Sequence, residues 1–275
     1  MQMPPSPHVA PQGPPPPGVM PGAMLSPDGL WRWDGSQWAP TGYAPPGFQP
    51  LRVFAAAAQR ANFALMGLAV VVVCEIIGIV AEMGRADIAS RLLDGSGASV
   101  SEATSSDNLV RLSGFLGLGA RALAAVAFLM WLYRVVANNH ALQRGHLQYT
   151  PGWAVGWWFI PFLNIVRPYQ VVAETWHATD PGAASSPQLA AKSDAPLLVV
   201  GWWLVYLAAG IIGVVAATMS GSDATLQSLH DGANVAIVGH VVGVVAAALA
   251  MIIVLRVTER QNALHGALEA APAPA

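Results

Sequence analysis

Four long apolar segments constrain this chain more than any other feature of its sequence. They cover residues 63–83, 113–135, 196–219 and 234–255. Each reaches the roughly 20 residues that a helix needs to cross the hydrocarbon core of a bilayer. A helix also bonds its own backbone N–H and C=O groups, as that core requires. The sequence therefore predicts an all-α integral membrane protein with four transmembrane helices, paired as two hairpins and joined by polar connections at 84–112 and 177–195.

The composition excludes several classes of protein. Only 10% of the 275 residues are charged, against about 25% in a typical soluble protein. The 13 basic and 15 acidic residues give a net charge of −2, so no basic excess favours a nucleic-acid partner. The single cysteine, Cys74, cannot form a disulfide within the chain or build a cysteine-ligated metal site. We expect no nucleic acid, no metal and no cofactor.

Catalytic motifs are missing as well. The chain has no P-loop, no G-x-G-x-x-G after a strand and no G-x-S-x-G elbow. His140, His146 and His177 do not have the i, i+4 spacing that places two metal ligands on one helix face. The sequence therefore predicts a protein that is not an enzyme, with no catalytic residues.

The first 50 residues form a region of different composition. They hold 14 of the 22 prolines, which favours a disordered, polyproline-like tail. Within this tail, residues 26–40 contain a Trp-rich motif in which two tryptophan-bearing stretches flank an Asp-Gly turn, a pattern typical of a hairpin. Two strands alone are marginally stable. The motif residues are Trp31, Trp33, Asp34, Gly35 and Trp38.

Segment 151–176 is apolar but interrupted by prolines and an arginine. The distribution of basic residues on the two sides of the membrane decides whether this segment crosses it. With four spans and a cytosolic amino terminus, three basic residues lie outside, namely Arg85, Arg91 and Arg111. Nine lie inside: Arg32, Arg52, Arg60, Arg134, Arg144, Arg167, Lys192, Arg256 and Arg260. A fifth crossing by 151–176 would invert this positive-inside bias. We therefore expect an interfacial or re-entrant element inside a membrane domain over 51–260, with a carboxyl-terminal tail at 261–275.

Three ionisable residues fall inside the predicted spans: Glu75, Arg121 and His240. Glu75 and Arg121 each lie eight residues from the outer end of their span, roughly 12 Å deep at 1.5 Å per residue. One interpretation is a proton or ion relay through all three. The other, which we favour because one acid and one histidine make a short relay, is a structural Glu75–Arg121 pair with His240 bonded to a backbone carbonyl. Nearby, Gly239 and Gly243 form a G-x-x-x-G stripe that favours close helix packing and allows an oligomer contact.

The run from Trp131 to Trp176 resembles the bacterial membrane family called domain of unknown function 4328. The resemblance rests on a PGWAVGWWFIP core followed by an asparagine and RPYQ, here Pro151, Trp153, Trp157, Trp158, Pro161, Asn164, Arg167, Pro168, Tyr169 and Gln170. The 26–40 motif is similar to short Trp-rich tails of actinobacterial membrane proteins. The family implies a membrane location and no activity.

These observations predict a multi-pass protein of the bacterial cytoplasmic membrane with both termini in the cytosol. We expect a non-catalytic scaffold or accessory protein, whose tail and 151–176 element engage a protein partner or the lipid bilayer. The alternative is a small transporter or channel, in which broken backbone around Pro161 and Asn164 lines a cavity. A membrane-embedded enzyme is the third possibility.

Overall fold

The computed structural model describes residues 31–33, 38–40, 54–142, 147–180, 197–221 and 223–270. The chain divides into two units, residues 1–52 and 53–275. In the first unit, β1 (Trp31–Trp33) pairs antiparallel with β2 (Trp38–Pro40), with Trp33 opposite Trp38. This is the pairing that the tryptophan spacing predicts. The Asp34-Gly35 turn and the rest of the Pro-rich tail lie outside the described residues.

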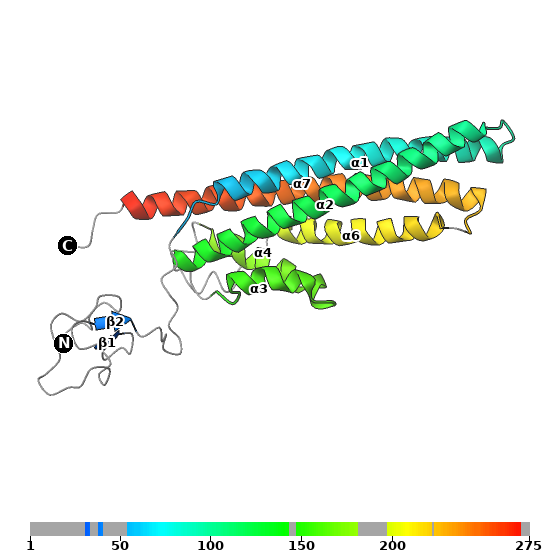
Figure 1. Cartoon of the computed structure of the whole chain (residues 1–275). Coiled ribbons are helices and arrows are strands. Elements are labelled where there is room, and N and C mark those ends of the chain that lie inside the picture. Colours follow the sequence, from blue (N-terminus) through cyan, green and yellow to red (C-terminus); the bar gives the residue numbers. More distant parts are fainter. Residues whose placement is uncertain are drawn as a thin grey trace, which may run out of the picture. The chain divides into compact units, whose positions relative to one another are not determined.

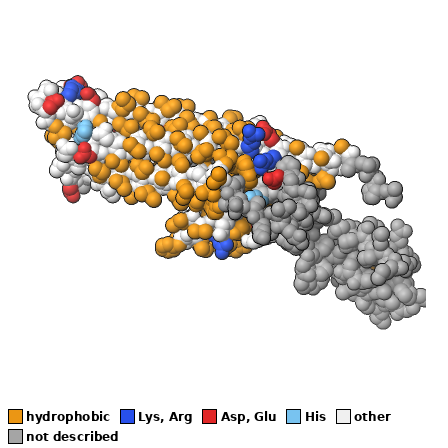
Figure 2. Space-filling view, turned by 180° about the vertical axis from the view of Figure 1, so that it is seen from behind, with side chains coloured by type: hydrophobic (Ala, Val, Ile, Leu, Met, Phe, Trp, Pro, Cys, Tyr) orange, Lys and Arg blue, Asp and Glu red, His pale blue; other side chains and the backbone are white. Residues whose placement is uncertain are grey.

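The second unit contains four long helices (Figure 1): α1 (Ala58–Leu93), α2 (Val100–Ala141), α6 (Leu197–Met219) and α7 (Leu226–Ala270). All four are long and apolar enough to cross a membrane. Each contains one of the four predicted spans, except that α6 begins one residue later than its span. Figure 2 shows apolar side chains covering the middle of this helical unit and charged side chains gathered toward its ends.

The long helices pack in the order α2, α1, α7, α6. Helix α1 packs along α2 and α7, and α6 packs along α7. In the described residues α2 and α6 do not pack along each other, although Phe128 of α2 and Trp202 of α6 are in contact with ring centres 6.0 Å apart. At the α1–α2 contact, a Cβ on Gly67 would lie 2.9 Å from the Ala124 Cα. Glycine at this position therefore lets the α1 and α2 backbones approach closely. In the order of packing, α1 and α7 form the middle of the bundle.

Residues 84–112 are not one polar connection, because the helices continue through most of them. Only residues 94–99 separate α1 from α2. Positive φ angles at Gly95 and Gly97 make the turn, and Ser99 caps α2 in a reciprocal capping box with Glu102. Arg91 bridges the hairpin to Glu102 at 3.3 Å. The expectation failed because local caps and ion pairs can extend a helix without an apolar period. For a similar reason α7 continues through the carboxyl-terminal tail predicted at 261–275 and ends at Ala270.

Segment 151–176 folds as a broken element of four short helical pieces. These are α3 (Pro151–Gly156), η1 (Trp157–Phe159), η2 (Leu163–Ile165) and α4 (Arg167–Ala178). Pro151 and Pro168 stand in the first turns of α3 and α4, where the missing N–H costs no hydrogen bond. Phe162 follows Pro161 with φ of 64°. The element packs on α2 and α6, and Trp203 donates its indole N–H to the Ile165 carbonyl at 2.8 Å.

Candidate functional site

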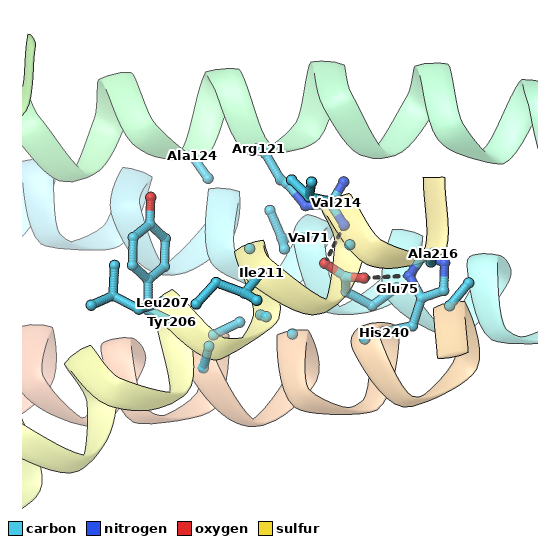
Figure 3. Close-up of a pocket in the computed structure, with 18 of the residues that line it drawn as sticks. Val71, Glu75, Arg121, Ala124, Tyr206, Leu207, Ile211, Val214, Ala216 and His240 are labelled. Carbon is cyan, nitrogen blue, oxygen red and sulfur yellow. Dashed lines mark hydrogen bonds and ion pairs between the residues drawn. The ribbon is translucent and has the colours of Figure 1, made fainter. Parts of the chain in front are cut away.

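Three helices bring the intramembrane ionisable residues together around one carboxylate. Arg121 of α2 donates to Glu75 Oε1 of α1 at 2.7 Å, and His240 Nδ1 of α7 lies 2.6 Å from Glu75 Oε2 (Figure 3). Both carboxylate oxygens of Glu75 are therefore engaged. The expectation that His240 bonds a backbone carbonyl was wrong, because its ring nitrogen Nδ1 lies within hydrogen-bond distance of the Glu75 carboxylate instead. We call Glu75, Arg121 and His240 the membrane triad.

Glycines provide the space that the membrane triad occupies. A Cβ on Gly243 would lie 2.9 Å from the Glu75 carboxyl carbon, and one on Gly78 would lie 2.5 Å from the His240 ring. A Cβ on Gly117 would lie 3.1 Å from Arg121 Nη1. Real Cβ atoms do not come so close without a shift of their neighbours. The sequence gives no sign that these glycines serve polar side chains, because glycine also marks ordinary helix packing.

The predicted G-x-x-x-G stripe is used within the chain. Gly239 faces α6, where a Cβ would lie 3.1 Å from Ile212 Cγ2, and Gly243 faces Glu75 of α1. Both positions are thus occupied by neighbouring helices of the same chain. An oligomer contact through Gly239 and Gly243 would have to displace them.

The membrane triad lies in a cavity of about 1220 Å³. We call this cavity the groove. Helices α2 and α6 form its walls, and α1 and α7 lie between them, as Figure 3 shows for the labelled residues. The broken element contributes Trp158, Asn164 and Ile165 to the lining. Most of the lining is apolar, including Val71, Ala124, Leu207, Ile211 and Val214.

The three triad side chains differ in their access to the groove. The Glu75 side chain is 4% exposed, His240 24% and Arg121 50%. The described residues supply one hydrogen-bond acceptor for Arg121, the Glu75 carboxylate, whereas a guanidinium has five N–H donors. Inside a bilayer, an N–H donor without a hydrogen-bond partner costs roughly several kcal/mol of free energy. Arg121 therefore requires water or a polar ligand in the groove.

A second polar cluster, absent from our sequence-based candidates, joins the ends of α2 and α7. Gln261 donates to the Val135 carbonyl at 2.9 Å and to Asn139 Oδ1 at 2.7 Å. Asn138 donates to Gln261 Oε1 and to the Ala55 carbonyl, both at 2.9 Å, and accepts from the Ala55 N–H. All three amide side chains are at most 1% exposed. We call Asn138, Asn139 and Gln261 the amide clamp. The adjacent asparagines that follow the second apolar run are the only signal that could have indicated it.

Several family-motif residues bond within the broken element or just before it. Arg167 donates to Gln170 Oε1 at 2.9 Å and to the Tyr149 hydroxyl at 3.3 Å, and Tyr149 donates to Gln170 Oε1. Arg167 also lies 5.4 Å from the centre of the Trp157 ring. Glu174 accepts the N–H groups of Gln148 and Tyr149. Burial raises the pKa of Glu174, although these two bonds act in the opposite direction.

The remaining motif residues have packing positions. Trp153 stacks on Trp157 with ring centres 4.7 Å apart. Trp158 packs edge-to-face on Phe128 of α2 and Trp203 of α6. Pro151 and Pro168 are buried, Tyr169 packs against the main apolar core, and Pro161 is exposed. Of the motif, the structure brings only Trp158 and Asn164 to the groove.

No group of three or more metal-ligating side chains occurs in the part of the chain that the structure describes. His140 contacts the Tyr149 carbonyl at 2.9 Å. His146 lies outside that part of the chain.

Four membrane-spanning helices with charged side chains at membrane depth define a multi-span helical membrane protein. More narrowly, the chain belongs to the family described as Domain of unknown function (DUF4328), whose model matches residues 94–259. No curated protein and no solved structure gives a significant match.

Proposed function

We propose that this protein is a small lipid transporter. In this proposal, a lipid head group moves along the groove while the acyl chains stay in the surrounding bilayer. The observation that carries the proposal is the membrane triad inside a groove whose two walls, α2 and α6, meet at Phe128 and Trp202 but do not pack along each other. Such a groove offers polar contacts at a depth where the bilayer has none. The broken backbone also lines it through Asn164, which is the feature expected for a transporter rather than a scaffold.

The length of the groove supports passage across the membrane. Its lining residues on α1 run from Leu68 to Arg85, a step of 17 residues or about 26 Å of helix. The hydrocarbon core is about 30 Å thick. Polar side chains occur at one end (Asn164), in the middle (the membrane triad) and at the other end (Arg85 and Ser220). A head group would therefore meet polar contacts along most of its path.

For the orientation, we propose four crossings of the cytoplasmic membrane with both termini in the cytosol. The support is the nine-to-three bias of basic residues. We further propose that the broken element lies at the cytosolic interface with its tip inserted among the lipids. Phe159 and Phe162 at this tip are 72% and 85% exposed, and exposed aromatic side chains favour the membrane interface.

Lipid translocation by purified protein in vesicles tests the proposal. A lipid labelled with the fluorophore NBD is bleached by dithionite only in the outer leaflet, so bleaching beyond the outer-leaflet share reports translocation. Gly210 lines the groove and Gly114 does not, and a Cβ at either position meets nothing within 4 Å. We expect Gly210→Trp to abolish translocation and Gly114→Trp to leave it at the wild-type level. Equal rates in empty and protein-containing vesicles would contradict the proposal.

The topology has its own test in intact cells. In a Cys74→Ser background, single cysteines replace Ser101, at the start of α2, and Ala270, at the end of α7. We expect a membrane-impermeant thiol reagent to label position 101 and not position 270. Labelling at position 270 would contradict a cytosolic carboxyl terminus.

A scaffold or accessory role is the second candidate. It is supported by the β1–β2 hairpin, which belongs to a compact unit separate from the membrane helices. Deletion of residues 1–52 separates the two roles. Translocation should survive this deletion if the groove carries the function, and it should be lost if the tail is required.

A further inference from the structure

We infer that the groove takes a phospholipid with an anionic head group, whose phosphate binds Arg121. The transport step rests on the proposed function, but the binding site rests on contacts and charge around Arg121 alone. The strongest support is the geometry of the Arg121 guanidinium. One nitrogen, Nη2, donates to Glu75 at 2.7 Å, and the side chain, which is half exposed, lines the groove.

A missing side chain leaves room for the guanidinium itself. Gly117 lies one helical turn before Arg121, and a Cβ there would come within 3.1 Å of Nη1. Glycine therefore lets the guanidinium lie against the α2 backbone, where it lines the groove with donors that Glu75 does not use. Arginine presents its donors as a planar fork that matches two oxygens of a phosphate. A phosphate is the head-group element that fits these donors at membrane depth.

The acidic partner uses both of its oxygens within the membrane triad. Glu75 is buried, with one oxygen on Arg121 and the other on His240. Its charge offsets that of Arg121 for membrane insertion, so the binding of an anion depends on the Arg121 donors that Glu75 does not use. The other acidic residue that lines the described groove, Glu82, lies 3.5 Å from Arg85. Both carboxylates are thus paired with an arginine.

The groove walls suit the rest of a lipid. Leu207, Ile211 and Val214 of α6 line the groove near the membrane triad. Apolar side chains at this depth match acyl chains. A water-soluble anion such as free phosphate would gain nothing from these walls. We therefore commit to a membrane lipid as the occupant.

The test measures binding and translocation separately, with phosphatidylglycerol as the anionic probe and phosphatidylcholine as the zwitterionic one. Lipid adducts on the full-length protein are compared by native mass spectrometry, and translocation is measured by the dithionite assay. The variants are Arg121→Gln, Glu75→Gln and the double variant Glu75→Gln/Arg121→Gln, which removes both charges and guards against misfolding. Arg111→Gln is the matched control, because Arg111 is an exposed α2 residue that does not line the groove.

We expect the wild type to prefer phosphatidylglycerol by about ten-fold, because both lipids carry a phosphate but only phosphatidylcholine adds a quaternary ammonium, which the Arg121 charge repels. Arg121→Gln and the double variant should lose this preference. Arg111→Gln should keep it, whereas Glu75→Gln should raise it, since Arg121 remains and its charge is no longer offset. A purely structural pair would instead affect Glu75→Gln and Arg121→Gln alike.

Two results would overturn part of the account, and they can be told apart. Equal binding of the two lipids by the wild type, or a preference that survives Arg121→Gln, would remove the anionic lipid site even if both lipids are translocated. An Arg121-dependent preference in binding without translocation of either lipid would retain the site and remove the transporter.

Discussion

The amide clamp and the membrane triad are both polar clusters that join α2 and α7, yet they use their polar groups differently. In the amide clamp, the amide nitrogens of Asn138 and Gln261 each donate two hydrogen bonds of 2.7 to 2.9 Å, and the side chains are at most 1% exposed. In the membrane triad, Arg121 is half exposed and uses one donor nitrogen. Asn138 and Gln261 thus use both N–H donors of their side chains within the protein, whereas Arg121 leaves donors for a ligand.

This difference separates a structural role from a binding role. A fully satisfied buried network rigidifies a fold, and here it connects the ends of two long helices to the chain just before α1. N–H donors that lack a partner beside a groove destabilise a protein in a bilayer unless a ligand or water accepts their hydrogen bonds. The clamp should therefore govern stability alone, and the triad should govern both stability and lipid binding.

The largest expected effect is on stability, at the amide clamp. Gln261→Leu would leave Val135 O, Asn139 Oδ1 and Asn138 Nδ2 without this partner in a buried site. At about 1 kcal/mol or more for each group, we expect a loss near 3 kcal/mol. Thermal unfolding in detergent, followed by tryptophan fluorescence, measures it. Asn262→Leu on the exposed neighbouring position is the control. Similar unfolding temperatures for the two variants would contradict a stabilising role of the amide clamp.

A smaller effect is expected at the Glu75–Arg121 pair, because the groove admits water to Arg121. Glu75→Gln and Arg121→Gln should each lower the unfolding temperature, and the double variant should lower it by less than the sum. We expect a coupling energy of about 1 to 2 kcal/mol from the double-mutant cycle. Strict additivity in the same thermal assay would mean that the two side chains do not interact.

Next in size is the space provided by Gly243. Gly243→Ala places a Cβ 2.9 Å from the Glu75 carboxyl carbon, so Glu75 must shift, at a cost of about 1 to 2 kcal/mol. Gly266→Ala on the same helix meets nothing within 4 Å and should be neutral or stabilising, since alanine favours helix. If both variants stabilise the protein, Gly243 does not seat the carboxylate.

The smallest expected effect is at the exposed capping box, a third polar cluster far from the groove. Ser99→Ala should cost about 1 kcal/mol and leave lipid binding unchanged. Hydrogen bonds from the Ser99 backbone and hydroxyl lower the pKa of Glu102 below its ordinary value of 4.5. A lowered pKa means that the cap stabilises the fold above that value and is lost as the pH falls below it.

Unfolding of the wild type and Ser99→Ala over a pH series checks this sign. The stability difference between them should be largest near neutral pH and shrink as the solution is acidified below pH 4.5. A difference that grows on acidification would contradict the assigned bonds.

Much of the membrane fold follows from the sequence, because apolar length alone fixes where helices cross. The meeting of Glu75 and Arg121 also follows, since equal depth in neighbouring spans and the cost of a lone charge leave few alternatives. The part that could not be predicted depends on three-dimensional packing. Gln261 reaches Asn139 over 122 positions of sequence, and no local pattern encodes such a contact.

The groove was equally hidden from the sequence. It arises because α2 and α6 do not pack along each other while α1 and α7 lie between them, and hydropathy does not encode the order of the helices. The direction of Asn164 into the groove depends on the break at Phe162, whose left-handed backbone is unusual for a bulky residue. The sequence therefore located the ionisable residues of the membrane triad but not the cavity that exposes them.

Transport along the groove depends most directly on whether water or a head group can reach the groove at membrane depth. Single cysteines in a Cys74→Ser background would replace Ala125, which lines the groove, and Leu123, which lines a separate apolar seam between α1 and α2. Both belong to the same span. We predict that a charged methanethiosulfonate reagent labels position 125 in reconstituted vesicles and spares position 123. No labelling at position 125, with both cysteines reactive after denaturation, would contradict a polar path through the membrane.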